Sequence, residues 1–169
     1  MHSTVFTLVK GVVNENYLEN FIHTDAEEVY DKIKVCDGVE KETNIFENWK
    51  WLLNCYGSFI TGEKIDDNYT ITINLEKLKE YFRNKNERLK ELVDKLDVKS
   101  WRFLSNDMIL YYMQNTIEDK RGFYIIDGDD KWRETDTFDT WLTVIYAVME
   151  DEKLENITYT IVETFDYHA

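Results

Sequence analysis

The chain has 169 residues, of which 43% are hydrophobic and 15% aromatic, a composition typical of one globular domain rather than of a disordered chain. No apolar run approaches the about 18 residues of a membrane span, and the N-terminus has no signal-peptide pattern, so we expect a cytoplasmic protein. The net charge of −14 disfavours direct binding to nucleic acid, because a surface this negative repels phosphate groups.

The charge is distributed unevenly along the chain. Residues 1–76 contain six basic and fourteen acidic side chains, and residues 103–169 contain five basic and fifteen acidic ones. Residues 77–102 are the exception, with nine Lys or Arg against five Asp or Glu. The acidic parts would attract a basic partner, while the same charge also serves solubility.

The first elements are a strand and two helices. Val, Phe and Thr over Ser3–Lys10 predict a strand, and residues 13–22 fit a short helix. Thr24 and Glu27 have the spacing of a capping box, and Gly38 is expected to end the helix that follows. The inward face of that helix is predicted to consist of Ala26, Val29, Tyr30, Ile33 and Cys36.

A third helix and a hairpin are predicted next. Asn44 and Glu47 repeat the capping pattern, and Gly57 ends the helix, whose apolar face is formed by Ile45, Trp49, Leu52, Leu53 and Tyr56. Ser58–Thr61 and Asn68–Asn74 are expected to pair across the polar loop Gly62–Asp67. The alternation of Thr with Tyr or Ile in the second arm indicates a strand with one wet face.

The most regular stretch is a long helix over residues 75–96, capped by Asn74. Leu75, Phe82, Leu89 and Leu96 recur every seven residues and predict one apolar stripe, which Lys85 interrupts, so a long coiled coil is not expected. The basic side chains of this helix could face phosphate groups or the acidic surface of a second copy in a homodimer. We favour a solvated face, because Glu and Asp occur three or four positions from several of them.

Residues 100–127 are compatible with two interpretations. Met108–Gln114 could form a helix or could pair as a strand with Phe123–Asp127, and the strand-like character of the latter favours the hairpin. Asp136 or Thr137 then caps a helix that carries Trp141 inward. Ile157–Phe165 is the last strand, with the same alternation as Asn68–Asn74: Thr158, Thr160 and Thr164 alternate with Ile157, Tyr159, Ile161 and Phe165. This order predicts an α+β fold in a single domain of residues 1–169, with an antiparallel sheet packed against several helices.

The densest acidic stretch is residues 127–139, with six carboxylates and two basic side chains. An EF-hand loop starting at Asp127 would need Gly at the sixth position, which is Trp132, and Glu at the twelfth, which is Phe138, so that motif is absent. A magnesium site, a solvated loop and a protein-binding loop stay open, and among functional interpretations we favour the last. Its candidate residues are Asp127, Asp129, Asp130, Trp132, Glu134, Asp136 and Asp139.

Trp51 is a further candidate for partner binding. It lies two positions from Trp49, so both indoles cannot lie on one helix face. Trp49 fits the inward face, which leaves Trp51 outside, where an exposed indole is typical of interfaces. A larger core that covers both rings is the alternative.

The sequence indicates no catalytic residue, metal site or cofactor. No Gly-rich phosphate loop, GxSxG, HExxH or CxxC motif occurs. His23 precedes a predicted helix cap and is interpreted as a surface residue, and Cys36 and Cys55 as reduced core residues. The chain is more consistent with a binding protein than with an enzyme.

Composition, charge and the missing motifs together favour a non-enzymatic protein that blocks a basic partner, most concretely a nuclease or another nucleic-acid-binding protein. In composition the chain is similar to phage-encoded inhibitors of restriction or CRISPR systems and to immunity proteins that neutralise nuclease toxins. The alternatives are a small metal-dependent hydrolase that uses the carboxylates of residues 127–139 and a housekeeping interaction subunit.

Overall fold

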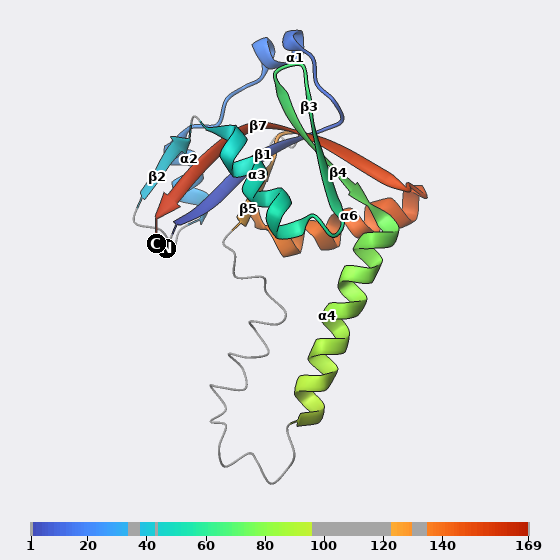
Figure 1. Ribbon diagram of the computed structural model, residues 1–169. Helices are drawn as coiled ribbons and strands as arrows, with labels where there is room; N and C mark the ends of the chain where they lie inside the picture. The colour runs from blue at the N-terminus through green and yellow to red at the C-terminus, as the bar shows by residue number, and fades with distance from the viewer. Residues whose placement is uncertain (1, 34–37, 43, 96–122, 130–134, 169) are drawn as a thin grey trace.

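A seven-stranded sheet organises the protein, with helices on both of its faces (Figure 1). The computed structural model describes residues 2–33, 38–42, 44–95, 123–129 and 135–168. The chain ends lie side by side, since His2 pairs with His168. The expected α+β fold is confirmed. None of the helices in the described part is long and apolar enough to cross a membrane.

The sheet is antiparallel except for one pair of strands. Its order is β3-β4-β7-β1-β5-β6, and β2 also pairs with β7. The parallel pair is β1–β5. The central strand β7 pairs with β1 on one side, and on its other side with β4 through its first half and with β2 through its last five residues. The strands are β1 (His2–Lys10), β2 (Gly38–Glu42), β3 (Ile60–Ile65), β4 (Asn68–Asn74), β5 (Phe123–Asp127), β6 (Thr135–Thr137) and β7 (Asn156–His168).

A bulge in β7 changes which side chains reach which face of the sheet. Thr7 pairs with Glu163 and Leu8 with Ile161, so Val162 has no partner residue in β1. Before the bulge, Ile161 belongs to the main core, and after it, Phe165 belongs to a cluster on the opposite face. The prediction of one uninterrupted alternation through Phe165 is therefore wrong, because the extra residue reverses the pleat.

Five helices are described: α1 (Glu15–Asn20), α2 (Ala26–Ile33), α3 (Ile45–Tyr56), α4 (Leu75–Lys95) and α6 (Phe138–Glu152). The caps predicted at Asn44, Asn74 and Thr137 are confirmed, since each side chain accepts a backbone N–H three residues later. The cap of α2 is shifted by one residue from the prediction. Asp25 accepts the N–H of Glu27, while Thr24 is buried.

The main core lies between one face of the sheet and the helices α3, α4 and α6. Leu52 and Tyr56 of α3, Leu78 of α4 and Trp141 of α6 are buried there, as predicted for Trp141. Trp49 is half-buried, and its indole N–H donates to the carbonyl of Thr70 at 2.9 Å.

The second face is partly covered by α2 and by the residues that follow β1, whereas no residue of α1 is buried. Val29 of α2 packs on Val5, Ile126 and Phe165. The Thr160 hydroxyl accepts the N–H of Val13 at 3.3 Å and donates to the carbonyl of Gly11 at 2.7 Å. The predicted wet strand face is wrong at Thr70 and Thr160, which are both buried.

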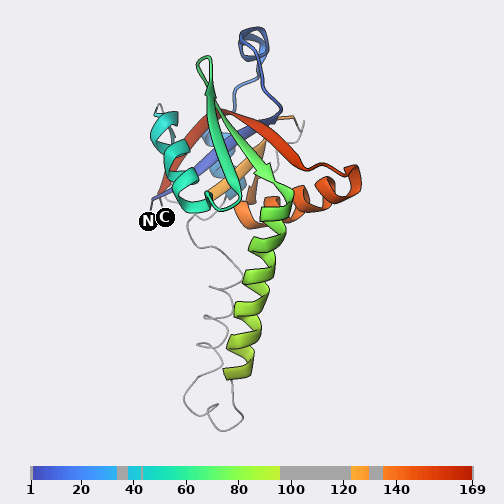
Figure 2. The same ribbon diagram turned by 45° about the vertical axis from the view of Figure 1, so that its right-hand side comes forward.

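The helix α4 agrees with the predicted range, and its second half extends away from the sheet in both views (Figures 1 and 2). The first turns bury Leu75 and Leu78. Lys85, which interrupts the apolar stripe, is 15% exposed and binds Asp139 of α6 at 3.0 Å. The polar interruption of the stripe therefore corresponds to a specific contact between two helices.

Two further predictions are wrong and two lie outside the described residues. Gly38 does not end α2 but begins β2, a strand that was not expected. Residues 62–65 are not part of a loop, because β3 continues to Ile65 and only Asp66 and Asp67 form the turn, Asp66 with a φ of 54°. Met108–Gln114 and Cys36 lie outside the described residues.

Candidate functional site

The structure separates the residues of the predicted acidic site. Asp127 ends β5 and Asp129 follows it, whereas Asp139 lies in the first turn of α6 beside Lys85. Asp136 is in β6, and nothing is described of its side chain. Asp130, Trp132 and Glu134 lie outside the described residues.

Asp139 has partners within the protein. Its carboxylate accepts from Lys85 at 3.0 Å and from the Tyr81 hydroxyl at 3.4 Å. Only 16% of its side chain is exposed. This carboxylate therefore stabilises the contact of α4 with α6, and little of it is available to another molecule.

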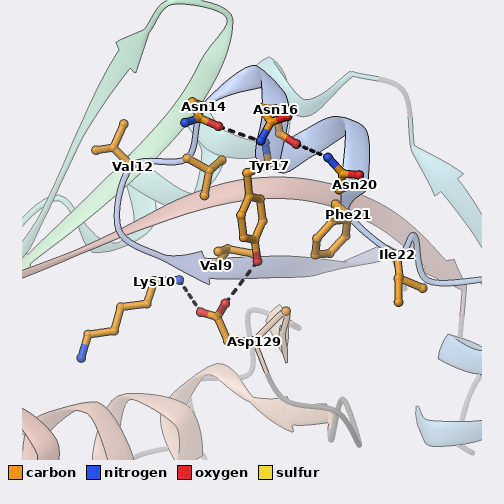
Figure 3. Close-up of a pocket in the computed structure, with 12 residues that line it drawn as sticks. Val9, Lys10, Val12, Asn14, Asn16, Tyr17, Asn20, Phe21, Ile22 and Asp129 are labelled. Carbon is orange, nitrogen blue, oxygen red and sulfur yellow. Dashed lines mark hydrogen bonds between the residues drawn. The ribbon is translucent and has the colours of Figure 1, made fainter.

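Asp129 is fixed at the corner where β5 ends (Figure 3). Its carboxylate accepts the backbone N–H of Lys10 at 2.8 Å and the hydroxyl of Tyr17 at 3.2 Å. Its own N–H donates to Asp127 at 2.9 Å. Gly128 allows the close approach to β1, because a Cβ there would lie 2.7 Å from Val9 Cγ2 and 2.9 Å from the carbonyl oxygen of Leu8.

A pocket of about 670 Å³ lies beside this carboxylate, between residues 12–22 and the ends of β1 and β5. The rings of Tyr17 and Phe21, with centroids 6.1 Å apart, extend from the α1 segment toward Val9 and Asp129 (Figure 3). The side chain of Lys10 turns away and reaches Glu152 at 3.6 Å. The remaining lining residues are Val12, Val13, Asn14, Asn16, Asn20, Ile22 and Gly128.

Residues 11–31 form a surface that the sequence analysis did not single out. They contain no Lys or Arg. Their six carboxylates are all exposed, and no described Lys or Arg forms an ion pair with them. We call this set the N-terminal acidic surface: Glu15, Glu19, Asp25, Glu27, Glu28 and Asp31.

Exposed apolar side chains accompany these carboxylates. Val12, Tyr17, Ile22 and Tyr30 are all exposed, with Ile22 at 76%. The prediction that Tyr30 lies on the inward face of α2 is therefore wrong, whereas Val29 is buried as predicted. Large apolar groups in water among acidic ones are typical of a protein-binding surface, because they become buried only when a partner docks. The signal available in the sequence was the absence of basic residues between Lys10 and Lys32.

Trp51 lies elsewhere. It is 38% exposed, and its ring centroid is 4.4 Å from that of Phe123, on the sheet face covered by α3, α4 and α6. The helix α2, which carries part of the N-terminal acidic surface, packs on the other face. The structure therefore does not bring Trp51 together with Asp127 and Asp129.

A buried carboxylate connects three segments beneath this surface. Glu163 of β7 has a side chain 1% exposed, and it binds His23 Nδ1 at 2.8 Å and Lys41 Nζ at 2.5 Å. It also accepts the N–H of Thr24 at 3.1 Å. His23 is 64% exposed, as expected of a surface residue, but its ring is held by a partner that local sequence does not indicate.

The basic residues of α4 are partly paired, as the favoured interpretation predicts. Lys79 binds Glu76 at 3.2 Å within the helix and Glu150 of α6 at 2.6 Å. These hydrogen bonds, the one to Glu150 first, raise the pKa of Lys79 above its usual value. Arg83 lies 3.6 Å from Glu80. The charges of Lys79, Arg83 and Lys85 are therefore matched within the protein.

Groups suited to metal binding are not found in the described residues, where no three His, Cys, Asp or Glu side chains are suitably placed. One buried hydroxyl has a shifted pKa. Burial raises the pKa of Tyr159 well above its usual value, and the charges of Asp127, Asp129 and Glu152 add to the effect. That hydroxyl therefore stays protonated near neutral pH.

No family model, curated protein or solved structure matches the chain. The interpretation of its function therefore depends on the chemistry of its own surface.

Proposed function

We propose that this protein is a non-enzymatic inhibitor that binds a basic protein and occupies the positively charged groove with which that partner binds nucleic acid. The supporting observation is the N-terminal acidic surface. Residues 11–31 present six exposed carboxylates and contain no Lys or Arg, while the half-exposed Lys41 on the same face of the sheet pairs with Glu163. An interface needs complementary charge of this kind to attract a basic partner rapidly and to reject acidic ones.

The spacing of these carboxylates suits a partner that binds phosphates. Glu27 and Asp31 are four residues apart in α2, so they lie on the same side of the helix with their Cβ atoms about 5–6 Å apart. A row of separated negative charges can take the place of successive phosphate groups in a groove lined by Lys and Arg. The adjoining Asp127 and Asp129 extend the negative charge toward the end of β5.

The exposed apolar side chains provide binding affinity that charge alone does not. Surface ion pairs contribute little affinity, whereas buried aromatic and aliphatic groups provide most of it. Tyr17, Ile22 and Tyr30 are exposed and alternate with the carboxylates in the sequence. We therefore expect charge to determine the association rate and these side chains to slow dissociation.

The test compares capture by two variants of equal net charge. One replaces four carboxylates of the N-terminal acidic surface and leaves the α2 cap intact: Glu15→Gln, Glu19→Gln, Glu27→Gln and Asp31→Asn. The control replaces four exposed carboxylates on α3, β3 and α4: Glu47→Gln, Glu63→Gln, Glu87→Gln and Asp94→Asn. Each variant and the unmodified protein are immobilised on a resin and incubated with a lysate of the cells in which the protein is made. The incubation is done at about 50 mM and about 300 mM salt, since contacts of this kind weaken steeply over that range.

The expected result is capture of a nucleic-acid-binding protein at low salt by the unmodified protein and by the control variant. DNA or RNA should compete for it, and the first variant should lose most of it. Equal losses in the two variants would contradict the proposal, because the effect would then come from net charge. Capture that nucleic acid does not compete would favour an interaction subunit instead.

A further inference from the structure

The pocket beside Asp129 has the chemistry to receive one cationic side chain. We propose that it binds a single arginine side chain of the basic partner, an inference that rests on the proposed function. The pocket lies within the surface of residues 11–31 and shares Tyr17 and Ile22 with it. The arginine would enter between the α1 segment and the end of β5, with its guanidinium on the carboxylate.

The carboxylate is oriented before any ligand arrives. One oxygen accepts the N–H of Lys10 and the other accepts the hydroxyl of Tyr17. A carboxylate has about four acceptor positions, so each oxygen retains one for a further donor. Two parallel N–H groups of a guanidinium match that arrangement, and the fixed carboxylate loses little freedom on binding.

The walls of the pocket favour arginine over other side chains. Figure 3 shows the rings of Tyr17 and Phe21 side by side above Asp129. A planar guanidinium stacks on aromatic faces, while its three-carbon stem packs against apolar groups such as Val9 and Ile22. Lysine has a compact, strongly hydrated ammonium that cannot donate two parallel hydrogen bonds to the carboxylate.

The local charge is suited to a cation. Lys10 is the one basic residue among the described lining residues, and its amine is directed to Glu152 instead of the pocket. Asp127 lies beside Asp129 and adds to the negative potential. The raised pKa of the nearby Tyr159 has these two carboxylates among its causes, after burial.

A titration with short peptides tests the pocket without the partner. The ¹⁵N-labelled full chain is titrated with the tripeptide acetyl-Gly-Arg-Gly-amide, and amide chemical shifts are followed. The controls are the same peptide with citrulline, which is neutral and nearly isosteric, and the one with lysine. We expect shifts centred on Lys10, Tyr17 and Asp129, with affinity for arginine at least about tenfold above that for citrulline and clearly above that for lysine.

Variants separate this pocket from general attraction to an acidic protein. Asp129→Asn keeps a partner for the Lys10 N–H and for Tyr17 but removes the charge, and should weaken arginine binding at least about fivefold. Phe21→Leu should weaken it without changing the carboxylate. Asp94→Asn near the end of α4 is the matched control and should bind like the unmodified protein.

Equal binding of the arginine and citrulline peptides would overturn the inference, as would arginine binding that Asp129→Asn leaves unchanged in a protein with the same melting temperature. Neither result would affect the proposed function, which the capture experiment tests separately. In that experiment, a protein with Asp129→Asn alone and with all six carboxylates of the N-terminal acidic surface unchanged should also capture less of the partner. Full capture by this variant would count against the pocket alone.

Discussion

Glu163 shows how a single residue can stabilise several segments. Its carboxylate lies under residues 11–31, where its charge would be unfavourable without partners. The partners come from two other segments: the loop before α2 provides His23 and the N–H of Thr24, and β2 provides Lys41. The bulge at Val162 directs Glu163 to this face of the sheet. The residue therefore joins β2 and the N-terminal acidic surface to the central strand.

The first prediction concerns the charge of Glu163. Replacement by glutamine keeps an acceptor for the Thr24 N–H but removes the charge that pairs with Lys41 and His23. We expect the free energy of unfolding to fall by about 1–3 kcal/mol, because Lys41 loses its ionic partner and His23 loses a charged hydrogen-bond partner, while both remain able to contact water. Equilibrium urea unfolding measures this difference.

The matched control is Glu155→Gln, an exposed glutamate just before β7. It should change the free energy of unfolding by no more than about 0.5 kcal/mol. If Glu163→Gln were as stable as this control, the buried carboxylate would contribute nothing through its charge.

At the scale of elements, the contact of Lys85 with Asp139 determines how α4 meets α6. Both side chains are about 15% exposed, and Asp139 also lies in the first turn of α6, where a negative charge is favourable. The Tyr81 hydroxyl donates to the same carboxylate. A polar contact in an apolar seam fixes which residues of the two helices face each other, and so fixes the direction of α4.

The second prediction is a measurable coupling between these residues. We expect a double-mutant cycle of Lys85→Met and Asp139→Asn to give a coupling energy of about 1 kcal/mol or more, because the pair is largely withdrawn from water. The cycle of Arg83→Met and Glu80→Gln, an exposed pair in the same helix, should give less than about 0.5 kcal/mol. Urea unfolding of the single and double variants measures both. Equal couplings would mean that burial does not strengthen the Lys85 pair.

Elements defined by local signals were predictable from the sequence. Asn44, Asn74 and Thr137 cap their helices through hydrogen bonds that span three residues, so the spacing is visible in the chain. The stripe of α4 has the same local character. These signals also determined the fold class, since strands and helices alternate without a regular βαβ pattern.

Elements held by distant partners were not predictable in the same way. The strand β2 contains Glu40, Lys41 and Glu42 and is ordered by pairing with β7, more than a hundred residues away. Glu63 and Lys64 suggested a loop, but they lie on the edge strand β3, where charged side chains face water. The predicted alternation of β7 through Phe165 is wrong for a related reason, because no local sequence signal indicates the bulge.

The same difference between local and distant signals applies to the candidate site. The acidic stretch of residues 127–139 was visible as composition. In the structure, however, Asp129 binds Tyr17, 112 residues away in the sequence, and Asp139 binds Lys85, 54 residues away. The N-terminal acidic surface has a simple composition signal, but its exposure depends on how residues 11–31 cover the sheet. Sequence can show where charge is dense, whereas tertiary contacts decide which carboxylates are available to a partner.

At the scale of the whole molecule, the net charge of −14 affects folding and binding in opposite directions. Like charges repel more strongly in the compact state, so salt should stabilise the free protein by screening them. The same screening should weaken association with a basic partner. Favourable pairs such as Lys85 with Asp139 are screened too, but the 34 acidic residues outnumber the 20 basic ones, and the repulsion should dominate.

The third prediction follows from this opposition. The melting temperature of the free protein should rise by several degrees between about 20 mM and about 300 mM sodium chloride, measured by circular dichroism; chloride is used because sulfate also strengthens apolar burial. The two variants with four fewer carboxylates should both show a smaller rise, and by similar amounts, since repulsion depends on total charge. Only the variant of the N-terminal acidic surface should lose partner capture. A melting temperature that falls with chloride would show that the attractive pairs outweigh the repulsion, and that the excess of acid is already balanced within the fold rather than held available for a partner.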